Sequence, residues 1–304
     1  MTIRSTSIWA TSLAGLWVAC ASNAPGDADP DADWMASLAE TTSLASITLP
    51  GTHDSAAIHE PIPGIAQTQT LTFAQQLAAG VRYFDVRCRN YEDTFTLYHG
   101  AIDEDQTFEA TVAVMDAFLA AHPSEALIVS IKEEVAGYRT TLPFDQVMAS
   151  YVAARPDRWA TGEALPMLGE VRGKIVLVRR FATTLAPLGI PAAPEVWTDN
   201  ATFSITGVAN LRVEDNYVVT DDAEKWTRIT SLFGEAHAAN DPSTLYLAYT
   251  SGYQMIAGLP NITSVSDTID PLLDTYFAAA TGSYGVVVMD FVTAARVHAV
   301  LAAN

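Results

Sequence analysis

The stretch Leu49-Pro50-Gly51-Thr52-His53-Asp54-Ser55, preceded by the apolar run 44–48, decides the fold assignment. The run predicts a β-strand, and the Pro-Gly pair is expected to end it with a sharp turn. His53 would then lie at the mouth of a strand, where an imidazole can move a proton near neutral pH. His99 follows the apolar segment 95–98 in the same way. Two histidines placed in this way indicate one general base and one general acid.

Short apolar runs alternate with longer amphipathic segments along the rest of the chain. Continuous apolar strands separated by helices are typical of a parallel sheet that is buried on both faces. About eight such strands predict a single-domain (β/α) barrel. The predicted strands are 46–49, 82–87, 94–98, 126–131, 174–178, 211–213, 245–249 and 286–289, and the predicted helices are 73–79, 108–121, 144–154, 223–239 and 269–280.

Ionisable side chains recur where these predicted strands end. In a barrel the carboxyl ends of the strands converge on one rim, which is where the active site lies. We therefore expect one cluster from residues that are far apart in sequence. Its members are His53, Arg87, His99, Lys132, Arg180, Asp215 and Asp290.

The charge of the chain excludes several classes of partner. With 16 basic and 35 acidic residues, the formal net charge of the 304-residue chain is -19. Nucleic-acid binding needs a basic footprint, which this composition does not provide. Electrostatic adhesion to anionic membranes is disfavoured for the same reason. Any phosphate site must therefore consist of a few local cations inside an acidic protein.

The N-terminus predicts export. Arg4 precedes a short apolar stretch, 8–21, that is too short to span a bilayer, so residues 1–21 are interpreted as a signal peptide. Cleavage before a lipid-modified Cys20, plain signal-peptidase cleavage and an uncleaved anchor remain open. We expect a secreted protein or one lipid-anchored at the cell surface. Residues 22–33 predict a flexible acidic linker, and 34–304 the catalytic domain. Cys88 is the other cysteine, so the sequence predicts no disulfide framework.

Taken together and in order, the segments from about Ser46 to Asp290 resemble bacterial phosphatidylinositol-specific phospholipases C. The segments that carry the resemblance are Pro50-Gly51-Thr52-His53-Asp54-Ser55, Gly80-Val81-Arg82-Tyr83-Phe84-Asp85-Val86-Arg87, Tyr98-His99-Gly100, Ser130-Ile131-Lys132-Glu133-Glu134, Arg172-Gly173-Lys174-Ile175-Val176-Leu177, Val213-Glu214-Asp215-Asn216-Tyr217 and Val288-Met289-Asp290-Phe291. The resemblance implies a distorted, incompletely closed (β/α)8 barrel. It also implies cleavage of phosphatidylinositol to diacylglycerol and inositol 1,2-cyclic phosphate. The substrate would be phosphatidylinositol with or without an attached glycan.

The resemblance also implies roles for individual residues. His53 would be the general base, oriented by Asp290. His99 would be the general acid, and Asp54 beside it would raise the pKa of His99 and keep the ring protonated. Arg87 would clamp the phosphate. Lys132, Arg180, Asp215 and Tyr217 match the inositol-binding positions. Structural roles, such as a turn-capping histidine or a salt-bridge network, are the competing interpretation.

Arg87 bears on the metal question. In calcium-dependent relatives this region supplies acidic ligands to a cation, and here a guanidinium would fill that space. We therefore expect no metal and no cofactor, although Asp85 would be a ligand if Arg87 moved away. We expect a monomer that contacts membranes transiently. The loop 56–64 lacks the exposed Trp of well-known family members, which implies weak membrane insertion.

Two other functions compete with this interpretation. A metal-dependent glycerophosphodiester phosphodiesterase on a similar barrel also carries paired histidines, but Arg87 and the pair Lys132 and Arg180 disfavour it. A catalytically silent binder of inositol lipids would be expected to have lost one of the proton-transfer residues. The histidines and both candidate aspartate partners are present.

Overall fold

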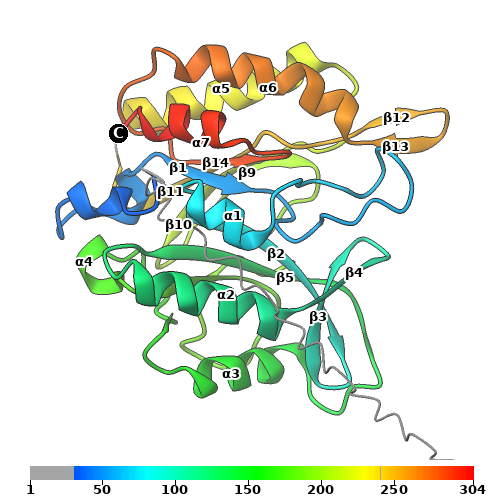
Figure 1. Ribbon diagram of the computed structural model, residues 1–304, viewed down its shortest axis with the longest axis vertical. Helices are drawn as coiled ribbons and strands as arrows, with labels where there is room; N and C mark the ends of the chain where they lie inside the picture. The colour runs from blue at the N-terminus through cyan, green and yellow to red at the C-terminus, as the bar shows by residue number, and fades with distance from the viewer. Residues whose placement is uncertain (1–30, 240) are drawn as a thin grey trace, which may run out of the picture.

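A curved sheet of mostly parallel strands forms the centre of the computed structural model, which describes residues 31–239 and 241–304 (Figure 1). Its hydrogen-bonded order is β6-β7-β5-β2-β1-β14-β11-β10-β9. The strands are β1 (Leu49–Thr52), β2 (Tyr83–Tyr91), β3 (Thr94–His99), β4 (Ile102–Thr107), β5 (Leu127–Tyr138), β6 (Trp159–Ala160), β7 (Ile175–Arg180), β8 (Ile190–Pro191), β9 (Ala201–Ile205), β10 (Asn210–Asp215), β11 (Thr244–Tyr249), β12 (Gln254–Ile256), β13 (Leu259–Asn261) and β14 (Val286–Met289).

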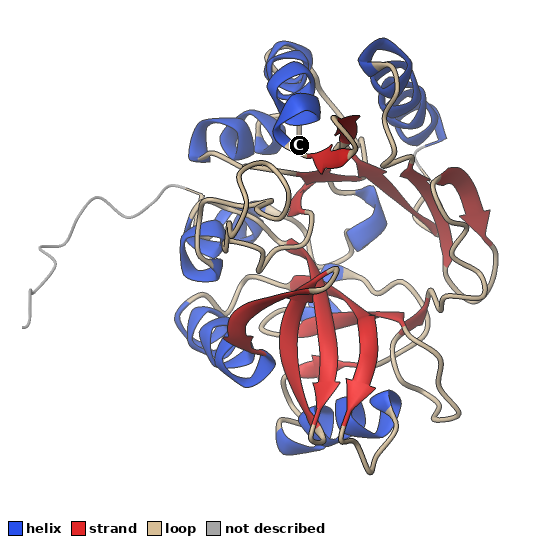
Figure 2. Ribbon diagram, turned by 90° about the vertical axis from the view of Figure 1, so that its right-hand side faces the viewer, coloured by secondary structure: helices blue, strands red, loops and turns tan. Residues whose placement is uncertain are grey.

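The helices lie outside this sheet, as Figure 2 shows from the side. They are α1 (Phe73–Ala78), α2 (Phe108–Ala121), α3 (Phe144–Ala154), α4 (Leu168–Val171), α5 (Asp222–Ala239), α6 (Thr263–Phe277) and α7 (Ala294–Leu301), with short 3₁₀ helices η1 (Trp34–Ser37) and η2 (Leu44–Ser46). Within the described residues, no helix combines the length and apolar character needed to cross a bilayer.

The barrel does not close. Strand β9 pairs antiparallel with β10, and in the part of the chain that the structure describes no ladder joins β9 to β6 or β8 at the other edge. The central pairs, from β7 through β5, β2, β1, β14 and β11 to β10, are all parallel. The expectation of a distorted, incompletely closed barrel is therefore confirmed.

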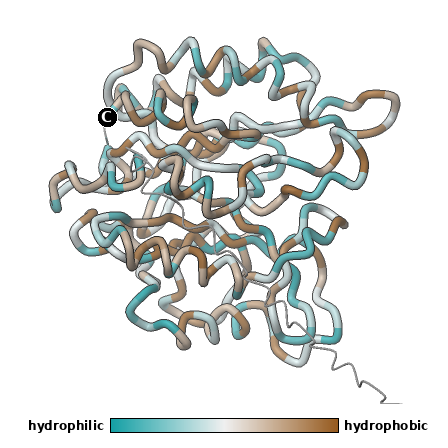
Figure 3. The backbone as a smooth tube through the Cα atoms, viewed as in Figure 1, coloured by the Kyte–Doolittle hydropathy of each residue, from teal (hydrophilic) through white to brown (hydrophobic). Residues whose placement is uncertain are grey.

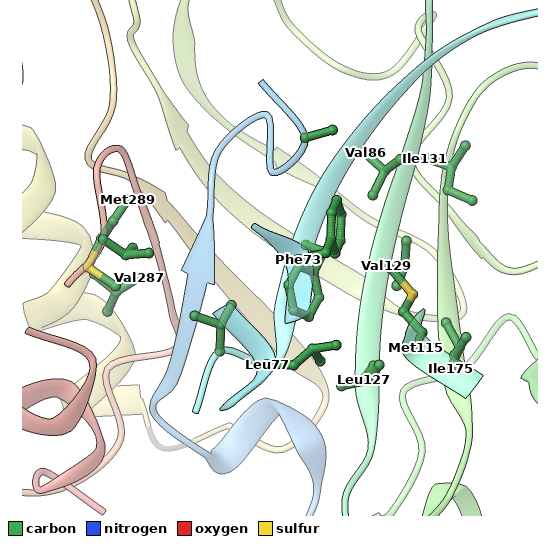
Figure 4. Packing of buried hydrophobic residues seen from close by; sticks show 14 of the residues in the cluster. Phe73, Leu77, Val86, Met115, Leu127, Val129, Ile131, Ile175, Val287 and Met289 are labelled. Carbon is green, nitrogen blue, oxygen red and sulfur yellow. The ribbon is translucent and has the colours of Figure 1, made fainter. Parts of the chain in front are cut away.

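Two apolar layers hold the sheet. One lies between the strands and the outer helices, where Phe73, Leu77 and Met115 pack against the outward-facing side chains of β2 and β5 (Figure 4). The other fills the barrel interior and contains Tyr83 and Val288. Figure 3 shows apolar segments, coloured brown, along the central strands. Because each fully buried aliphatic or aromatic side chain contributes roughly 1.5–3 kcal/mol, these layers stabilise the barrel.

The first strand is shifted from its predicted position. The run 44–48 forms η2 and an irregular link, whereas β1 itself contains Pro50 and Gly51, so the prediction that they end the strand was wrong. Proline has no backbone N–H to donate. At position 50 this costs no hydrogen bond to β2, because β2 begins only at Tyr83, opposite Gly51. The Pro50 carbonyl still accepts from Arg82 N at 3.0 Å.

Segment 94–98 was also predicted as a barrel strand, and this was wrong. Strand β3 pairs antiparallel with β2 and β4, so it forms a hairpin that extends beyond the barrel rim. The final predicted helix begins earlier than expected, at Thr263 rather than 269, and ends at Phe277. The other four helices lie within two residues of their predicted positions.

The predicted signal peptide, Cys20 and most of the predicted linker lie outside the described residues. The last three linker residues, 31–33, belong to the fold. The buried Arg82 guanidinium donates through Nη2 to the carbonyls of Asp31 at 3.4 Å and Ala32 at 2.7 Å, while Glu125 pairs with the same group at 2.9 Å. Residues 31 and 32 thus contact the barrel through Arg82.

Gly51 is required where β1 approaches its neighbours. A Cβ atom there would lie 3.0 Å from Tyr83 Cβ and 3.1 Å from Val286 Cγ1, both in the packed interior. We expect Gly51→Ala to lower the free energy of unfolding by about 1–3 kcal/mol, measured by urea denaturation. Gly234→Ala is the matched control, because Gly234 lies within α5 with nothing within 4 Å of the added atom. That variant should gain up to about 1 kcal/mol, and an equal response at both sites would contradict the packing argument.

Candidate active site

A cavity of about 600 Å³ opens at the carboxyl ends of the barrel strands. Its lining combines ionisable side chains, among them most of those expected at the rim, with apolar ones. The polar lining comprises His53, Arg87, His99, Lys132, Glu134, Arg180, Asp199, Asp215 and Tyr217. The apolar lining includes Ile65, Ala192, Pro194, Trp197, Tyr253, Pro260 and Ile262. The predicted convergence of distant residues on one rim is what the fold produces.

His53 is held by the strand beside its own. It directly follows β1, and its backbone N–H donates to the Met289 carbonyl at 2.9 Å, which aligns it with Asp290 after β14. The ring Nδ1 lies 2.8 Å from Asp290 Oδ1. Because the carboxylate accepts, Nδ1 carries the hydrogen, and Nε2 of the neutral ring is left as the acceptor. Arg87 Nη2 donates to that Nε2 at 2.6 Å.

Arg87, which ends the barrel part of β2, lies among three carboxylates. Its guanidinium contacts Asp85 at 3.2 Å, Glu134 at 3.4 Å and Asp54 at 3.5 Å. Burial opposes the charge, but Asp85, Glu134 and Asp54 outweigh it and hold the pKa of Arg87 well above its usual value. The salt-bridge network that competed with a phosphate role is therefore present, and the same guanidinium also reaches the general-base candidate, His53.

Arg180 is the second cation around Asp85. Its Nη1 lies 3.3 Å from Asp85 Oδ1, and its guanidinium lies 3.7 Å from the ring centroid of Trp197. Asp85 is fully buried, and although burial alone would raise its pKa, Arg87 and Arg180 lower it below the usual value. Asp85 thus lies between two arginines and fixes the position of one relative to the other.

His99 arrives from the β3 hairpin and faces His53. The two ring centroids are 6.3 Å apart, with an interplanar angle of 88°. His99 Nδ1 lies 2.6 Å from the Ala66 carbonyl, so it carries the hydrogen in that bond. Nε2 points towards Asp54 Oδ2 at 3.8 Å, beyond hydrogen-bond distance.

The expectation that Asp54 raises the pKa of His99 is wrong. Burial, the Arg87 charge and the His53 ring lower the pKa of His99 to about 4. Asp54 does not reverse this shift. Its carboxyl is 1% exposed, neither oxygen has a hydrogen-bond partner among the described residues, and burial raises its pKa well above the usual value. Desolvation is the largest effect on the pKa of both groups.

Lys132 and Glu134 connect the hairpin to the barrel. Lys132 Nζ lies 2.6 Å from Glu134 Oε2, and Glu134 Oε1 accepts from the backbone N–H of Gly100 at 3.0 Å. Burial would raise the pKa of Glu134, but Arg87 and Lys132 lower it below the usual range. From the sequence, Glu134 was given no role beyond the salt-bridge network. In the structure it pairs with Arg87 and Lys132 and accepts a hydrogen bond from Gly100, the residue after His99.

Two further lining residues were missed from the sequence. Trp197 Nε1 donates to Asp215 Oδ2 at 2.9 Å, and Tyr217 Oη donates to Asp199 Oδ1 at 2.7 Å. Trp197 and Asp199 lie in the loop between β8 and β9, where no periodicity or motif marks them. The predicted inositol-binding residues Asp215 and Tyr217 are in the cavity, and each has a partner from this loop.

The acidic residues around Arg87 are not arranged for a metal. Within residues 31–239 and 241–304, no group of three or more His, Cys, Asp or Glu side chains is placed to hold an ion. The guanidinium occupies the space towards which Asp54, Asp85 and Glu134 converge. The arrangement therefore provides a fixed organic cation there.

Comparison with known proteins finds one matching family model. The family model described as "Phosphatidylinositol-specific phospholipase C, X domain" matches residues 48–181, which include His53, Arg87, His99 and Lys132. The match covers less than half of the 304-residue chain and takes in the first part of the barrel, through β7.

Among relatives, the chain is 29% identical over 233 residues to a 1-phosphatidylinositol phosphodiesterase of Staphylococcus aureus (strain Newman), covering 72% of this chain and 74% of the relative. It is 27% identical over 270 residues to the Listeria monocytogenes protein of the same name, covering 85% and 80%.

Solved structures share the fold. A double mutant of the S. aureus phosphatidylinositol-specific phospholipase C superimposes with a TM-score of 0.81 at 24% identity, over 90% of this chain and 97% of that chain. The L. monocytogenes enzyme gives a TM-score of 0.74 at 22% identity, over 90% and 98%. These likenesses support the incompletely closed barrel described above.

The depressed pKa of His99 has a measurable consequence. By histidine NMR, the ring should titrate near pH 4 in the wild type, because it is buried and lies beside the Arg87 charge. Arg87→Met should move this titration towards the ordinary value of 6.5, whereas Arg87→Lys, which keeps the charge, should move it less. The folded state binds this proton less readily than the unfolded state, so His99 makes the protein lose stability as the pH falls from about 6.5 to about 4. A wild-type titration near 6.5 would contradict this assignment.

Proposed function

We propose that the protein cleaves phosphatidylinositol, with or without an attached glycan, to diacylglycerol and inositol 1,2-cyclic phosphate without a metal ion. One observation carries the proposal: two imidazoles from separate strands face one another across 6.3 Å, with a guanidinium bound to one of them, at the mouth of a polar cavity. A phosphodiester between the rings meets a proton acceptor on one side and a donor on the other. The names of the relatives, 1-phosphatidylinositol phosphodiesterase, support this substrate.

His53 is the general base in this mechanism. The Asp290 carboxylate fixes Nδ1–H, so Nε2 is the atom that takes the proton from the inositol 2-hydroxyl as its oxygen attacks phosphorus. Asp290 then stabilises the imidazolium that forms. The attack releases the glycerol oxygen and closes the cyclic phosphate, so no water enters the first step.

His99 delivers a proton to the leaving glycerol oxygen. A bound phosphate places negative charge beside Arg87 and offsets the charge that depresses the pKa of His99. Asp54 Oδ2 lies 3.8 Å from Nε2, the atom that carries the transferred proton. Nδ1 stays bonded to the Ala66 carbonyl, which keeps the ring oriented.

Arg87 binds the phosphate and Lys132, Arg180, Asp215 and Tyr217 bind the inositol ring. A guanidinium presents paired donors to phosphate oxygens and stabilises charge that develops in the transition state. Asp85 and Glu134 hold Arg87 in place before substrate arrives, so little reorganisation is needed. Arg180 is itself held by Asp85 and Trp197, which places a rigid donor at the inositol end.

The apolar wall leads to the surface that would meet the lipid. The hairpin of β12 and β13 carries Met255, Ile256 and Leu259, each at least half exposed, and Ile62 lies in a neighbouring loop. Ile262 N donates to the Gly64 carbonyl at 2.8 Å, so the two segments are joined. We call Ile62, Met255, Ile256 and Leu259 the rim patch, and we propose that it touches the bilayer transiently. One similar solved structure comes from work titled "Modulation of S.aureus Phosphatidylinositol-Specific Phospholipase C Membrane Binding".

Export and a monomeric state belong to the proposal as well. The N-terminal pattern of Arg4 and the apolar stretch 8–21 supports a signal peptide, and Cys20 supplies a residue for lipidation. Both lie outside the described residues, so secretion and surface anchoring stay predictions of the sequence.

The reaction can be followed by phosphorus NMR with phosphatidylinositol and a chelator. The first product should be a five-membered cyclic phosphate, formed at the same rate with and without the chelator. His53→Ala and His99→Ala should each lower the rate by about 10²–10⁴ because each removes one proton-transfer group. His298→Ala is the matched control, since this histidine is exposed on α7 and pairs with Asp31.

Different results would support the alternatives. Activity lost with chelator and restored by a divalent cation would favour the metal-dependent glycerophosphodiester phosphodiesterase, with Asp85 as a ligand. Binding of inositol lipid without turnover would favour the silent binder. A near-normal rate in either histidine variant would remove that residue from the mechanism.

The rim patch is tested with lipid in two physical forms. Replacing Ile256 and Leu259 together by serine should lower turnover of phosphatidylinositol in vesicles about tenfold, because roughly 25 cal/mol is lost per Å² of apolar contact. Turnover of a monomeric short-chain phosphatidylinositol should not change. Val208→Ser is the control, as Val208 is 69% exposed at the opposite end of β10 from Asp215. Equal losses on both substrates would show damage to the cavity rather than to a membrane contact.

A further inference from the structure

The hairpin that carries His99 has a second face that the proposed mechanism does not use. Along β2, Arg87, Arg89 and Tyr91 alternate with buried Cys88 and Asn90. Since successive side chains of a strand point to opposite faces, Arg89 and Tyr91 continue the face on which Arg87 meets the cavity.

The orientation of this face follows from the packing of the other one. Phe95 of β3 stacks on Phe144 at 4.2 Å and contacts Phe108 at 5.9 Å, so α2 and α3 cover that side. The opposite side faces away from these helices. Figure 1 places the β3–β4 hairpin and the β12–β13 hairpin on the same side of the molecule, and Figure 2 views that side directly. The β3–β4 hairpin therefore lies on the same side of the molecule as the β12–β13 hairpin, which carries Met255, Ile256 and Leu259 of the rim patch.

Aromatic rings and guanidinium groups cover this free face. Tyr91 and Tyr138 stack with ring centroids 5.1 Å apart and are 37% and 38% exposed. The Arg89 guanidinium lies 5.4 Å from the rings of both Tyr98 and Tyr138, and Arg139 lies 5.1 Å from Tyr138. We call Arg89, Tyr91, Tyr98, Tyr138 and Arg139 the hairpin face.

Arg89 is unusual in having no acidic partner. Its Nε donates to the Ala136 carbonyl at 3.1 Å and its Nη1 to Tyr98 Oη at 3.4 Å. In the described part of the chain, the basic residues that form no ion pair are Arg89, Lys174 and Arg179. Arg179 is buried at 9% exposure, and Lys174 lies before β7, at the barrel end opposite the cavity. An uncompensated cation in an acidic protein thus lies beside the active site.

We propose that the hairpin face binds headgroup phosphates of the bilayer that surrounds the substrate, as a second contact besides the rim patch. This inference rests on the proposed lipid substrate. Guanidinium pairs with phosphate through directed hydrogen bonds, and tyrosine concentrates at the membrane–water interface because its ring is apolar and its hydroxyl polar. The proposal commits to a phospholipid surface because the face is on the cavity side and its unpaired cation complements phosphate.

This contact also answers a problem of charge. A protein of net charge -19 is repelled by a bilayer that contains anionic phosphatidylinositol. Screening limits that repulsion to roughly 8 Å at physiological salt, so the charges nearest the surface decide the outcome. The rim patch supplies apolar contact, and the hairpin face supplies a cation at the same surface.

The test measures binding to vesicles of equal parts phosphatidylcholine and phosphatidylglycerol without any phosphatidylinositol. Arg89→Gln should weaken binding about fivefold, the amount expected for one basic residue at an anionic surface, and high salt should remove the difference. Tyr91→Ser combined with Tyr138→Ser should also weaken it. Arg228→Gln is the matched control because it removes the same charge from an exposed arginine on α5, where Glu224 is its partner. Equal effects of Arg89→Gln and Arg228→Gln, or no effect of Arg89→Gln, would overturn the proposal.

Activity on monomeric short-chain phosphatidylinositol separates this proposal from the proposed function. Arg89→Gln should leave that activity unchanged, and a parallel loss would assign Arg89 to the cavity instead and overturn the membrane role. A wild type that cleaves the monomeric lipid but fails to bind the vesicles would overturn only the hairpin-face proposal. A wild type that binds vesicles with the expected Arg89 dependence but cleaves neither lipid would overturn the proposed reaction and leave the surface contact standing.

Discussion

The buried ion cluster around Arg87 is the constraint on which the site depends. One guanidinium is held by Asp54, Asp85 and Glu134, and its Nη2 also donates to His53. These groups come from β1, β2 and β5, so the cluster joins three neighbouring strands at their carboxyl ends. Ions in a water-poor site require compensation, and a change in one member leaves the others unpaired. Catalytic geometry and local stability are therefore two consequences of the same contacts.

The cluster also explains the contrast between the two histidines. His53 is oriented by a carboxylate and accepts from Arg87, which suits a ring that must start without a proton on Nε2. Among the described residues, the hydrogen-bond partner of the His99 ring is a backbone carbonyl, and burial and the Arg87 charge depress its pKa. In the proposed mechanism, Arg87 therefore contacts the base directly and lowers the proton affinity of the acid until a phosphate offsets its charge. The difference between the rings arises from their neighbours rather than from the side chain itself.

The sequence allowed the barrel and most of the site to be predicted because strand ends carry local signals. His53, Arg87, Lys132, Arg180, Asp215 and Asp290 each lie at or directly after the last residues of a strand, or where a strand passes the rim, and the parallel pairing brings them together. The end of β1 was placed too early because proline usually breaks a strand. The sequence does not show that the neighbouring strand β2 begins only at Tyr83 and so needs no N–H from residue 50. The antiparallel pairing of β3 was missed because its apolar run looks the same in a hairpin as in a barrel.

Other parts of the site depend on long-range contacts and were beyond such reasoning. Trp197 and Asp199 lie in an irregular loop, and only the folded chain brings them to Asp215 and Tyr217. The protonation of His99 was misjudged because Asp54, the nearest acid, was counted without the desolvation that raises the pKa of Asp54 itself. An aspartate adjacent in sequence to a histidine is thus weak evidence for an imidazolium when both are buried.

Net charge is a poor guide to phosphate recognition in this protein. The acidic excess acts on distant solvent, where salt screens it within roughly 8 Å. Inside the cavity, Arg87, Lys132 and Arg180 each have a carboxylate partner. Asp85 is fully buried, whereas Glu134 lines the cavity beside the cations. Each carboxylate binds some of the N–H donors of its cation and holds that cation in place. The remaining N–H donors of the cation can bind a ligand that enters the cavity. Under the proposed function, a strongly acidic chain binds an anion because the cations gathered in the cavity act at short range, where the charges of the distant surface are screened.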